Sequence, residues 1–180
     1  MKFTYKDDPM FNTIVRWVIN SEGEWSNDPR DPGGPTKWGC AWNKVGHIVK
    51  SMYGYSTWQE MREKLTQDQA KELYFIHFYK ASGAAGLSDE GLSYMQFDCA
   101  VNQGVGRARK LLKGLPVNPF HYDGRGSKNS ELFLYLYFEY MIARMEEYAK
   151  LPLSLREINM TGWMNRLRSV YAGIKVLEKL

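Results

Sequence analysis

The sequence predicts a mainly α-helical protein, and three observations support this fold class. Apolar residues recur at helical spacing along most of the 180 residues. No segment alternates apolar and polar residues for long enough to predict a large sheet. One stretch, residues 23–39, is dense in glycine, proline and aspartate, which favour turns. This stretch predicts a structured loop or a short β-hairpin after the first helix.

The first helix is expected at residues 9–22. Asp8 and Pro9 supply an N-cap and a first-turn proline. Its core face is predicted by an apolar stripe of Phe11, Ile14, Val15, Val18 and Ile19. Further helices are expected at residues 43–53, 57–65, 67–80, 89–102, 105–113, 129–149 and 161–178. The helix at 67–80 carries a capping-box pattern at Thr66 and Gln69.

The length suits one substantial core or two small lobes. Helical spacing is interrupted at Gly83-Ala84-Ala85-Gly86, which makes this segment the candidate boundary. We therefore expect a first lobe at residues 1–87 and a helical second lobe at residues 88–180, or one compact domain formed by both.

The composition and charge of the chain indicate which classes of partner to expect. The chain is 44% hydrophobic and 14% aromatic, as in an ordinary globular protein. Its net charge of +4 is spread along the chain, and without a basic stripe we expect no nucleic-acid partner. No stretch approaches the ~20 apolar residues that span a bilayer, so no stable membrane insertion is expected. The N-terminus lacks a signal peptide's apolar run, which predicts synthesis in the cytoplasm.

The cysteines and histidines suggest no metal chemistry. Cys40 and Cys99 lie far apart and outside any zinc-ligand spacing, so we expect two buried free thiols. The three histidines are scattered. We expect neither a metal nor another cofactor.

Two carboxylates could act together beside the turn-rich stretch. Glu22 continues the apolar stripe in the last predicted turn of the first helix, where desolvation and the helix dipole both favour the protonated carboxyl group. Asp31 lies in a polar turn, where it would stay ionised, and the hydroxyl of Thr36 could hold a water. A neutral acid and a charged carboxylate are the two parts of glycosidic hydrolysis. Spacing alone favours the alternative, in which Glu22 is a polar residue at the helix end and Asp31 shapes an Asp-Pro turn.

Aromatic residues surround the same stretch. Trp25, Trp38 and Trp42 could offer apolar platforms to sugar rings. Core packing is the alternative reading, and we expect it for at least one of the three.

Read as a string, residues 22–39 (EGEWSNDPRDPGGPTKWG) resemble the signature of glycoside hydrolase family 108, the phage-type N-acetylmuramidases also known as secretion activators. The block Phe97-Asp98-Cys99-Ala100-Val101-Asn102-Gln103-Gly104 resembles a second family motif that precedes a predicted peptidoglycan-binding region. Gly162-Trp163 and Asn165-Arg166, near the C-terminus, also resemble the family's pattern. The sequence departs from the pattern in two places: Glu24 replaces a glycine, and Cys40-Ala41 replaces Ile-Thr after Gly39.

The resemblance implies a lysozyme-like helical fold, with a catalytic lobe followed by a peptidoglycan-binding one. It places the catalytic glutamate on Glu22 and suggests Asp31 and Thr36 as the pair that positions water. Trp25, Trp38 and Asn102 are the expected substrate-binding residues, while Asp98 is expected to be a structural carboxylate bonded to backbone or arginine. On a continuing helix Glu24 would point roughly 200° away from Glu22.

The implied partner is the peptidoglycan glycan strand. The enzyme would act on the cell wall, in the periplasm, after a separate holin-like protein releases it, either as a phage endolysin or in secretion. The alternative is a non-catalytic wall-binding or secretion-accessory protein that keeps the fold.

Overall fold

The computed structural model describes residues 4–20, 24–27, 33–121 and 130–178. The chain divides into two compact units, Met1–His77 (unit 1) and Phe78–Leu180 (unit 2). The division falls within a helical run, where α4 (Gln67–Tyr74) continues into a π-helical segment, η2 (Phe75–Lys80). It therefore precedes the glycine-rich segment at 83–86 that the sequence favoured as a boundary.

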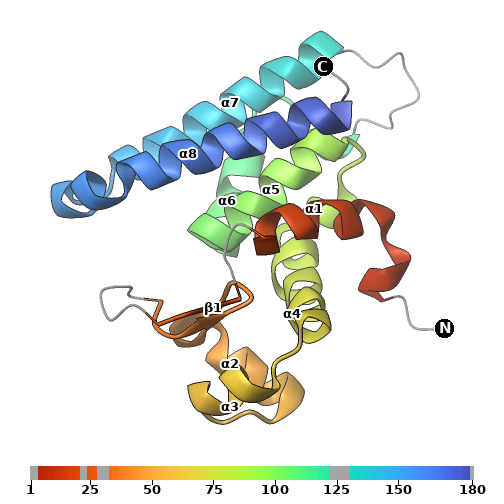
Figure 1. Ribbon diagram of the computed structural model, residues 1–180. Helices are drawn as coiled ribbons and strands as arrows, with labels where there is room; N and C mark the ends of the chain where they lie inside the picture. The colour runs from red at the N-terminus through yellow and green to blue at the C-terminus, as the bar shows by residue number, and fades with distance from the viewer. Residues whose placement is uncertain (1–3, 21–23, 28–32, 122–129, 179–180) are drawn as a thin grey trace. The chain divides into compact units, whose positions relative to one another are not determined.

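Unit 1 consists of short helices and a small sheet (Figure 1). Its other elements are η1 (Tyr5–Asp7), α1 (Pro9–Asn20), β1 (Trp25–Ser26), β2 (Thr36–Lys37), β3 (Cys40–Ala41), α2 (Trp42–Tyr53) and α3 (Trp58–Lys64). Both α2 and α3 are in contact with the sheet. The predicted capping box at the start of α4 is present, with the Thr66 hydroxyl accepting from the Gln69 backbone N–H at 3.2 Å.

Helix α1 forms for the reasons that the sequence indicates. The Asp8 carboxylate accepts a hydrogen bond from the Phe11 N–H at 2.8 Å, satisfying a donor that the first turn leaves unpaired. The predicted stripe of Phe11, Ile14, Val15, Val18 and Ile19 is buried, each side chain at most 2% exposed. The described helix ends at Asn20.

The turn-rich stretch forms a three-stranded antiparallel sheet in the order β1-β2-β3. Ser26 pairs with Thr36 and Lys37 pairs with Cys40. Trp38 and Gly39 join β2 to β3 and both have positive φ angles, 51° and 76°, as a tight two-residue hairpin turn requires. The prediction of a hairpin after the first helix is confirmed, and β3 adds a third strand.

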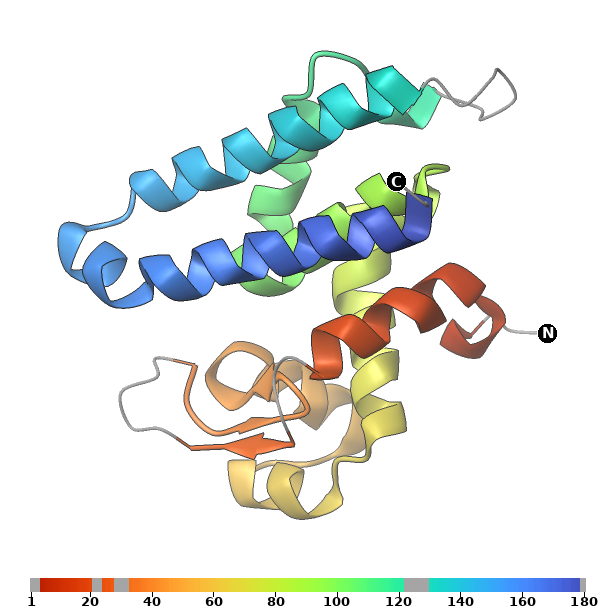
Figure 2. The same ribbon diagram turned by 45° about the horizontal axis from the view of Figure 1, so that its top comes forward.

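Unit 2 is a helical assembly around α5 (Glu90–Gln103), whose residues from Gly91 to Ala100 are all buried. Helices α6 (Val105–Lys113), α7 (Ser130–Ala149) and α8 (Leu153–Glu178) all contact α5. Figure 2 shows α7 and α8 as two long helices that run in opposite directions and are connected at one end by a short turn. Two 3-10 turns, η3 (Ala84–Gly86) and η4 (Pro119–His121), complete the unit.

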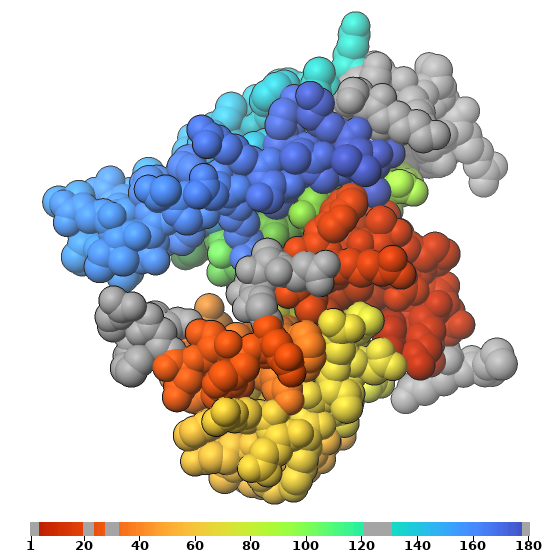
Figure 3. Space-filling model, viewed as in Figure 1, coloured from red at the N-terminus to blue at the C-terminus, as the bar shows by residue number. Residues whose placement is uncertain are grey.

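The last helix begins earlier than the sequence predicted. It starts at Leu153 rather than residue 161, and the Pro152 carbonyl accepts from the backbone N–H of Arg156 at 3.1 Å. The prediction was wrong because the first two turns bury no apolar stripe: Leu153 is 60% and Ile158 is 79% exposed. Figure 3 shows this part of α8, in light blue, at the surface. Among the described helices, none combines the length and apolar character needed to cross a membrane.

Candidate functional site

The six predicted site residues divide between described and undescribed parts of the chain. Glu22 and Asp31 lie in residues 21–23 and 28–32, outside the described residues. Thr36, Trp25 and Trp38 lie in or beside the small sheet of unit 1, and Asn102 lies on α5 of unit 2. The sheet thus groups three of the six.

Thr36 is held in place by the backbone around it. Its side-chain hydroxyl donates to the Gly34 carbonyl at 2.9 Å, and the residue is only 8% exposed. Because the hydroxyl proton is committed to that carbonyl, the lone pairs of the Thr36 oxygen are the part that can accept a hydrogen bond. This orientation suits an acceptor for a water proton.

The segment before Thr36 is anchored on the start of α2. The Gly33 carbonyl accepts from the Asn43 N–H at 3.1 Å, and the Pro35 carbonyl accepts from the Trp42 N–H at 2.9 Å. Gly34 has φ of 70°, and a Cβ there would lie 2.7 Å from the Asn43 side-chain amide nitrogen. The Gly-Gly-Pro-Thr run therefore needs its second glycine, and α2 fixes the position of Thr36.

Both predicted aromatic platforms are partly exposed. Trp25 is stacked on Trp58, with ring centroids 6.0 Å apart, and the Arg62 guanidinium lies 5.0 Å from the Trp25 ring. Trp38 occupies the β2–β3 turn, and its backbone N–H donates to the Glu24 carbonyl at 3.0 Å. Packing against α3 therefore accounts for part of the Trp25 surface.

Glu24 requires a correction to the sequence argument. The angle between Glu22 and Glu24 assumed a continuing helix, and it does not apply because Glu24 lies in a bend directly before β1. The Glu24 side chain is exposed. Its backbone carbonyl, bonded to Trp38, helps to close the sheet.

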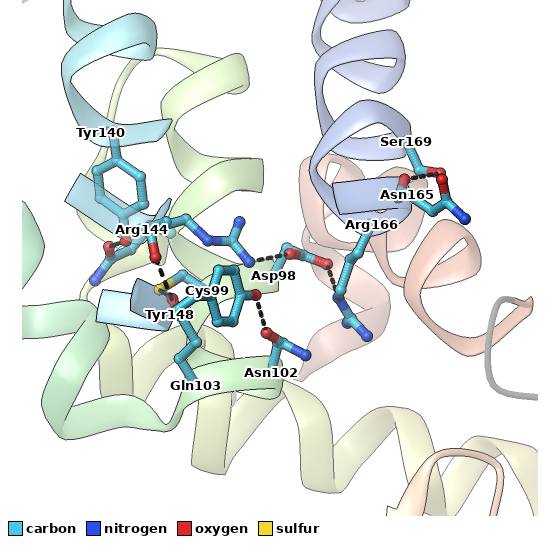
Figure 4. Close-up of polar contacts among 11 residues, drawn as sticks. Asp98, Cys99, Asn102, Gln103, Tyr140, Arg144, Tyr148, Asn165, Arg166 and Ser169 are labelled. Carbon is cyan, nitrogen blue, oxygen red and sulfur yellow. Dashed lines mark hydrogen bonds and ion pairs between the residues drawn. The ribbon is translucent and has the colours of Figure 1, made fainter. Parts of the chain in front are cut away.

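Unit 2 contains a buried charge cluster on α5, α7 and α8 (Figure 4). The Asp98 carboxylate accepts from Arg144 Nη2 at 2.8 Å and from Arg166 Nε at 3.0 Å, which confirms the prediction that Asp98 is a structural carboxylate. Burial opposes the charge on Arg144, but Asp98 and nearby polar groups outweigh it and raise the Arg144 pKa. The Arg144 guanidinium therefore stays ionised.

Asn102 lies one helical turn after Asp98 and is partly exposed. The Tyr148 hydroxyl donates to the Asn102 side-chain oxygen at 2.5 Å, and the Tyr148 ring stacks on Trp163 with centroids 4.5 Å apart. Burial raises the Tyr148 pKa, so its hydroxyl remains a donor.

Sequence reasoning missed Arg144 and Tyr148, although a signal was present. Tyr140, Arg144 and Tyr148 recur every four residues and so share one face of α7. An arginine between two tyrosines on the inward face of an apolar helix indicates a buried acidic partner.

Neither Cys40 nor Cys99 forms a disulfide, and both are buried, as predicted. Burial raises the Cys99 pKa, so this thiol lacks the thiolate character of a nucleophile. Within residues 4–20, 24–27, 33–121 and 130–178, no group of three or more histidine, cysteine or carboxylate side chains is arranged to hold a metal.

A mainly helical chain whose small antiparallel sheet follows its first helix has a lysozyme-like fold. The family model for Glycosyl hydrolase 108 matches residues 15–104, half of the chain, and the chain belongs to this family. Its fold is similar to the solved structure of Brucella abortus SagA, with a TM-score of 0.70, 22% identity, and coverage of 91% of this chain and 92% of that one. No curated protein matches significantly. The protein is a glycoside hydrolase that acts on peptidoglycan as lysozymes do.

Proposed function

We propose that the enzyme is an N-acetylmuramidase, which cleaves the glycan strand at N-acetylmuramic acid with Glu22 as general acid. Support comes chiefly from the family match, which spans residues 15–104 and so contains Glu22, Asp31 and Thr36 together. Further support comes from the Thr36 hydroxyl, which donates to the Gly34 carbonyl and so leaves its oxygen lone pairs as possible acceptors.

The proposed reaction divides the proton transfers between two carboxyl groups. Glu22 gives its proton to the glycosidic oxygen as the bond to the anomeric carbon breaks. Asp31 accepts a proton from the water that attacks this carbon, and Thr36 holds the same water by accepting its second proton in a hydrogen bond. Before the next turnover Glu22 regains a proton from solvent and Asp31 loses one to it.

Trp25 and Trp38 are proposed to contact sugar rings through their exposed portions. Both flank the strand that carries Thr36, and both are partly exposed. An indole beside the catalytic strand offers an apolar face to the C–H groups of a sugar. Asn102 is the proposed substrate ligand from unit 2.

The two lobes are proposed to have different functions, catalysis and peptidoglycan binding. Residues 1–87 would carry catalysis, since they contain the acid, the sheet and both tryptophans. Residues 88–180 would bind peptidoglycan, a role that the sequence resemblance suggests and that the surface around Asn102 could serve.

The proposed place of action is the cell wall, in the periplasm. A separate holin-like protein would release the enzyme, and its task would be either phage lysis or protein secretion. The rival proposal, a wall-binding or secretion-accessory protein without activity, predicts binding to peptidoglycan without any new reducing ends.

Product analysis tests the function. Purified peptidoglycan is incubated with the protein, and new reducing ends are reduced with borohydride and identified. We expect muramitol as the new terminus, because the proposed reaction cleaves the bond at the anomeric carbon of N-acetylmuramic acid and leaves that sugar as the new reducing end. Glucosaminitol would indicate a glucosaminidase instead, and binding without new ends would favour the accessory role.

Replacing Thr36 by valine should lower kcat while leaving the fold intact. Valine keeps the branched shape and suits a strand, but it removes the hydroxyl that holds the water. One positioning hydrogen bond of about 1 to 2 kcal/mol corresponds to roughly a 5- to 30-fold loss. Thr36→Ser, which keeps the hydroxyl, is the control. Equal kcat for the valine and serine variants would remove Thr36 from the mechanism.

A further inference from the structure

Two side chains of α3 pack on the sheet of unit 1 through Trp25. Trp58 and Arg62 lie four residues apart, so they share one face of α3. The Trp58 ring stacks on the Trp25 ring at an interplanar angle of 24°, and the Arg62 guanidinium lies over the Trp25 ring, 5.0 Å from its centroid. Lys37 pairs with Trp25 across the strands, and its amino group donates to the Arg62 backbone carbonyl. These four residues are called the Trp25 cluster.

The Trp25 cluster lies on the face of the sheet opposite the Thr36 side chain. Successive residues of a strand point to opposite faces, and Lys37 directly follows Thr36 on β2. Side chains that are paired across two strands lie on one face, so Trp25 lies with Lys37. A ligand on this cluster would therefore be a part of a long substrate that lies outside the bond being cleaved.

The cluster presents two cations to solvent. Arg62 is exposed, and Lys37 is partly exposed, as are both tryptophans. Neither cation forms an ion pair with a carboxylate in the part of the chain that the structure describes. By contrast Lys64, the other basic residue of α3, pairs with Glu60 at 3.0 Å. Glu63 follows Arg62 about 100° further around the helix.

The donors of the Arg62 guanidinium are open to a ligand. A guanidinium has five N–H donors, and the contact with the Trp25 ring supplies none of them with an oxygen acceptor. A carboxylate can accept two parallel hydrogen bonds from such a group. Indole faces offer apolar contact area to the C–H groups of a sugar. Together these groups match a sugar unit that carries a carboxylate.

We propose that the Trp25 cluster is an exosite for a carboxylate of the peptidoglycan strand, carried by the stem peptide or by the lactyl group of N-acetylmuramic acid. The proposal rests on the proposed function, since the ligand is part of that substrate. Arg62 binds the carboxylate, Lys37 adds positive charge beside it, and the two indoles contact the attached sugar. The exosite would let the enzyme distinguish peptidoglycan from neutral N-acetylglucosamine polymers.

The test uses the full, unmodified chain labelled with 5-fluorotryptophan. The chain has six tryptophans, and the ¹⁹F resonance of Trp58 is identified with Trp58→Phe. The probes are two pairs, each a carboxylate and its amide: N-acetylmuramyl-L-alanyl-D-glutamate with its diamide, and N-acetylmuramic acid with its lactyl amide. None contains a glycosidic bond between sugars, so none is consumed.

We expect at least one carboxylate to shift the Trp58 resonance and to bind about 5- to 10-fold more tightly than its amide, as a charged hydrogen bond at an exposed site allows. The first pair reports the stem peptide and the second reports the lactyl group. The pair that shows the preference therefore identifies the carboxylate that Arg62 binds.

Arg62→Gln is the decisive variant, because it removes the guanidinium charge and leaves both indoles in place. We expect this variant to bind each carboxylate no more tightly than its amide, while amide binding stays as in the parent. Arg109→Gln is the matched control, since Arg109 is an exposed arginine on α6 in unit 2 and its loss changes the net charge equally. This control should keep the preference of the parent.

Equal binding within both pairs by the unmodified protein would overturn the proposal, and this comparison needs no variant at the cluster. An unchanged preference in folded Arg62→Gln protein would overturn it as well. Peptidoglycan hydrolysis by the unmodified enzyme is measured separately. Hydrolysis without a carboxylate preference would refute only the exosite, whereas a preference without hydrolysis would refute only the muramidase assignment.

Discussion

Glu22→Gln is expected to reduce the release of reducing ends from peptidoglycan by about 10² to 10⁴-fold or more, the usual contribution of a general acid. Glutamine keeps the length and shape of the side chain but has no proton to give to the departing oxygen. The loss should appear in kcat, because the substitution leaves the sheet and its tryptophans in place. Reducing-sugar release under saturating peptidoglycan measures it, and circular dichroism checks the fold.

The control for this experiment is Glu24→Gln, two residues along the chain. Glu24 is exposed, and its contact with the sheet is made by the backbone carbonyl rather than the carboxylate. We therefore expect near-normal activity for this variant. A large loss of activity for Glu24→Gln together with normal activity for Glu22→Gln would show that Glu24, not Glu22, is the general acid.

Helix positions were predictable wherever one face is buried. The stripe from Phe11 to Ile19 predicts α1 because those side chains reach a core. By contrast, α8 was predicted to start eight residues late, since Leu153 and Ile158 face solvent and mark no core face. Backbone hydrogen bonds hold those first turns, and such bonds leave no apolar pattern in a sequence.

For the sheet and the buried charge cluster, too, some features were predictable from the sequence and others were not. Turn chemistry predicts a loop or short hairpin within residues 23–39, but it does not locate the turn at Trp38-Gly39, because tryptophan rarely adopts the positive φ that Trp38 has there. The partners of Asp98 were predictable in kind but not in identity. Arg144 and Arg166 lie 46 and 68 residues away along the chain, and only the packing of α7 and α8 on α5 brings them to the carboxylate. Contacts between distant helices depend on tertiary packing, which local spacing does not encode.

Asp98→Asn is expected to destabilise unit 2 by about 3 to 5 kcal/mol, the usual cost of leaving one buried ion-pair partner unmatched. Asparagine has nearly the same shape but no charge, so the fully buried Arg144 guanidinium loses its counter-charge. Because a folded domain has only about 5 to 15 kcal/mol of stability, this loss should be plain in urea unfolding. Trp163 is the only tryptophan among residues 78–180, so its ¹⁹F resonance in protein labelled with 5-fluorotryptophan reports unit 2 specifically.

Asp68→Asn is the matched control, since its carboxylate is 65% exposed and lies 3.8 Å from Lys6 and 3.9 Å from Lys71. Exposed pairs of this kind contribute about 0 to 1 kcal/mol. Adding Arg144→Met to Asp98→Asn should recover part of the lost stability, because it removes the unmatched buried cation and leaves an apolar side chain of similar length. If Asp98→Asn unfolds at the same urea concentration as Asp68→Asn, the buried cluster does not stabilise unit 2.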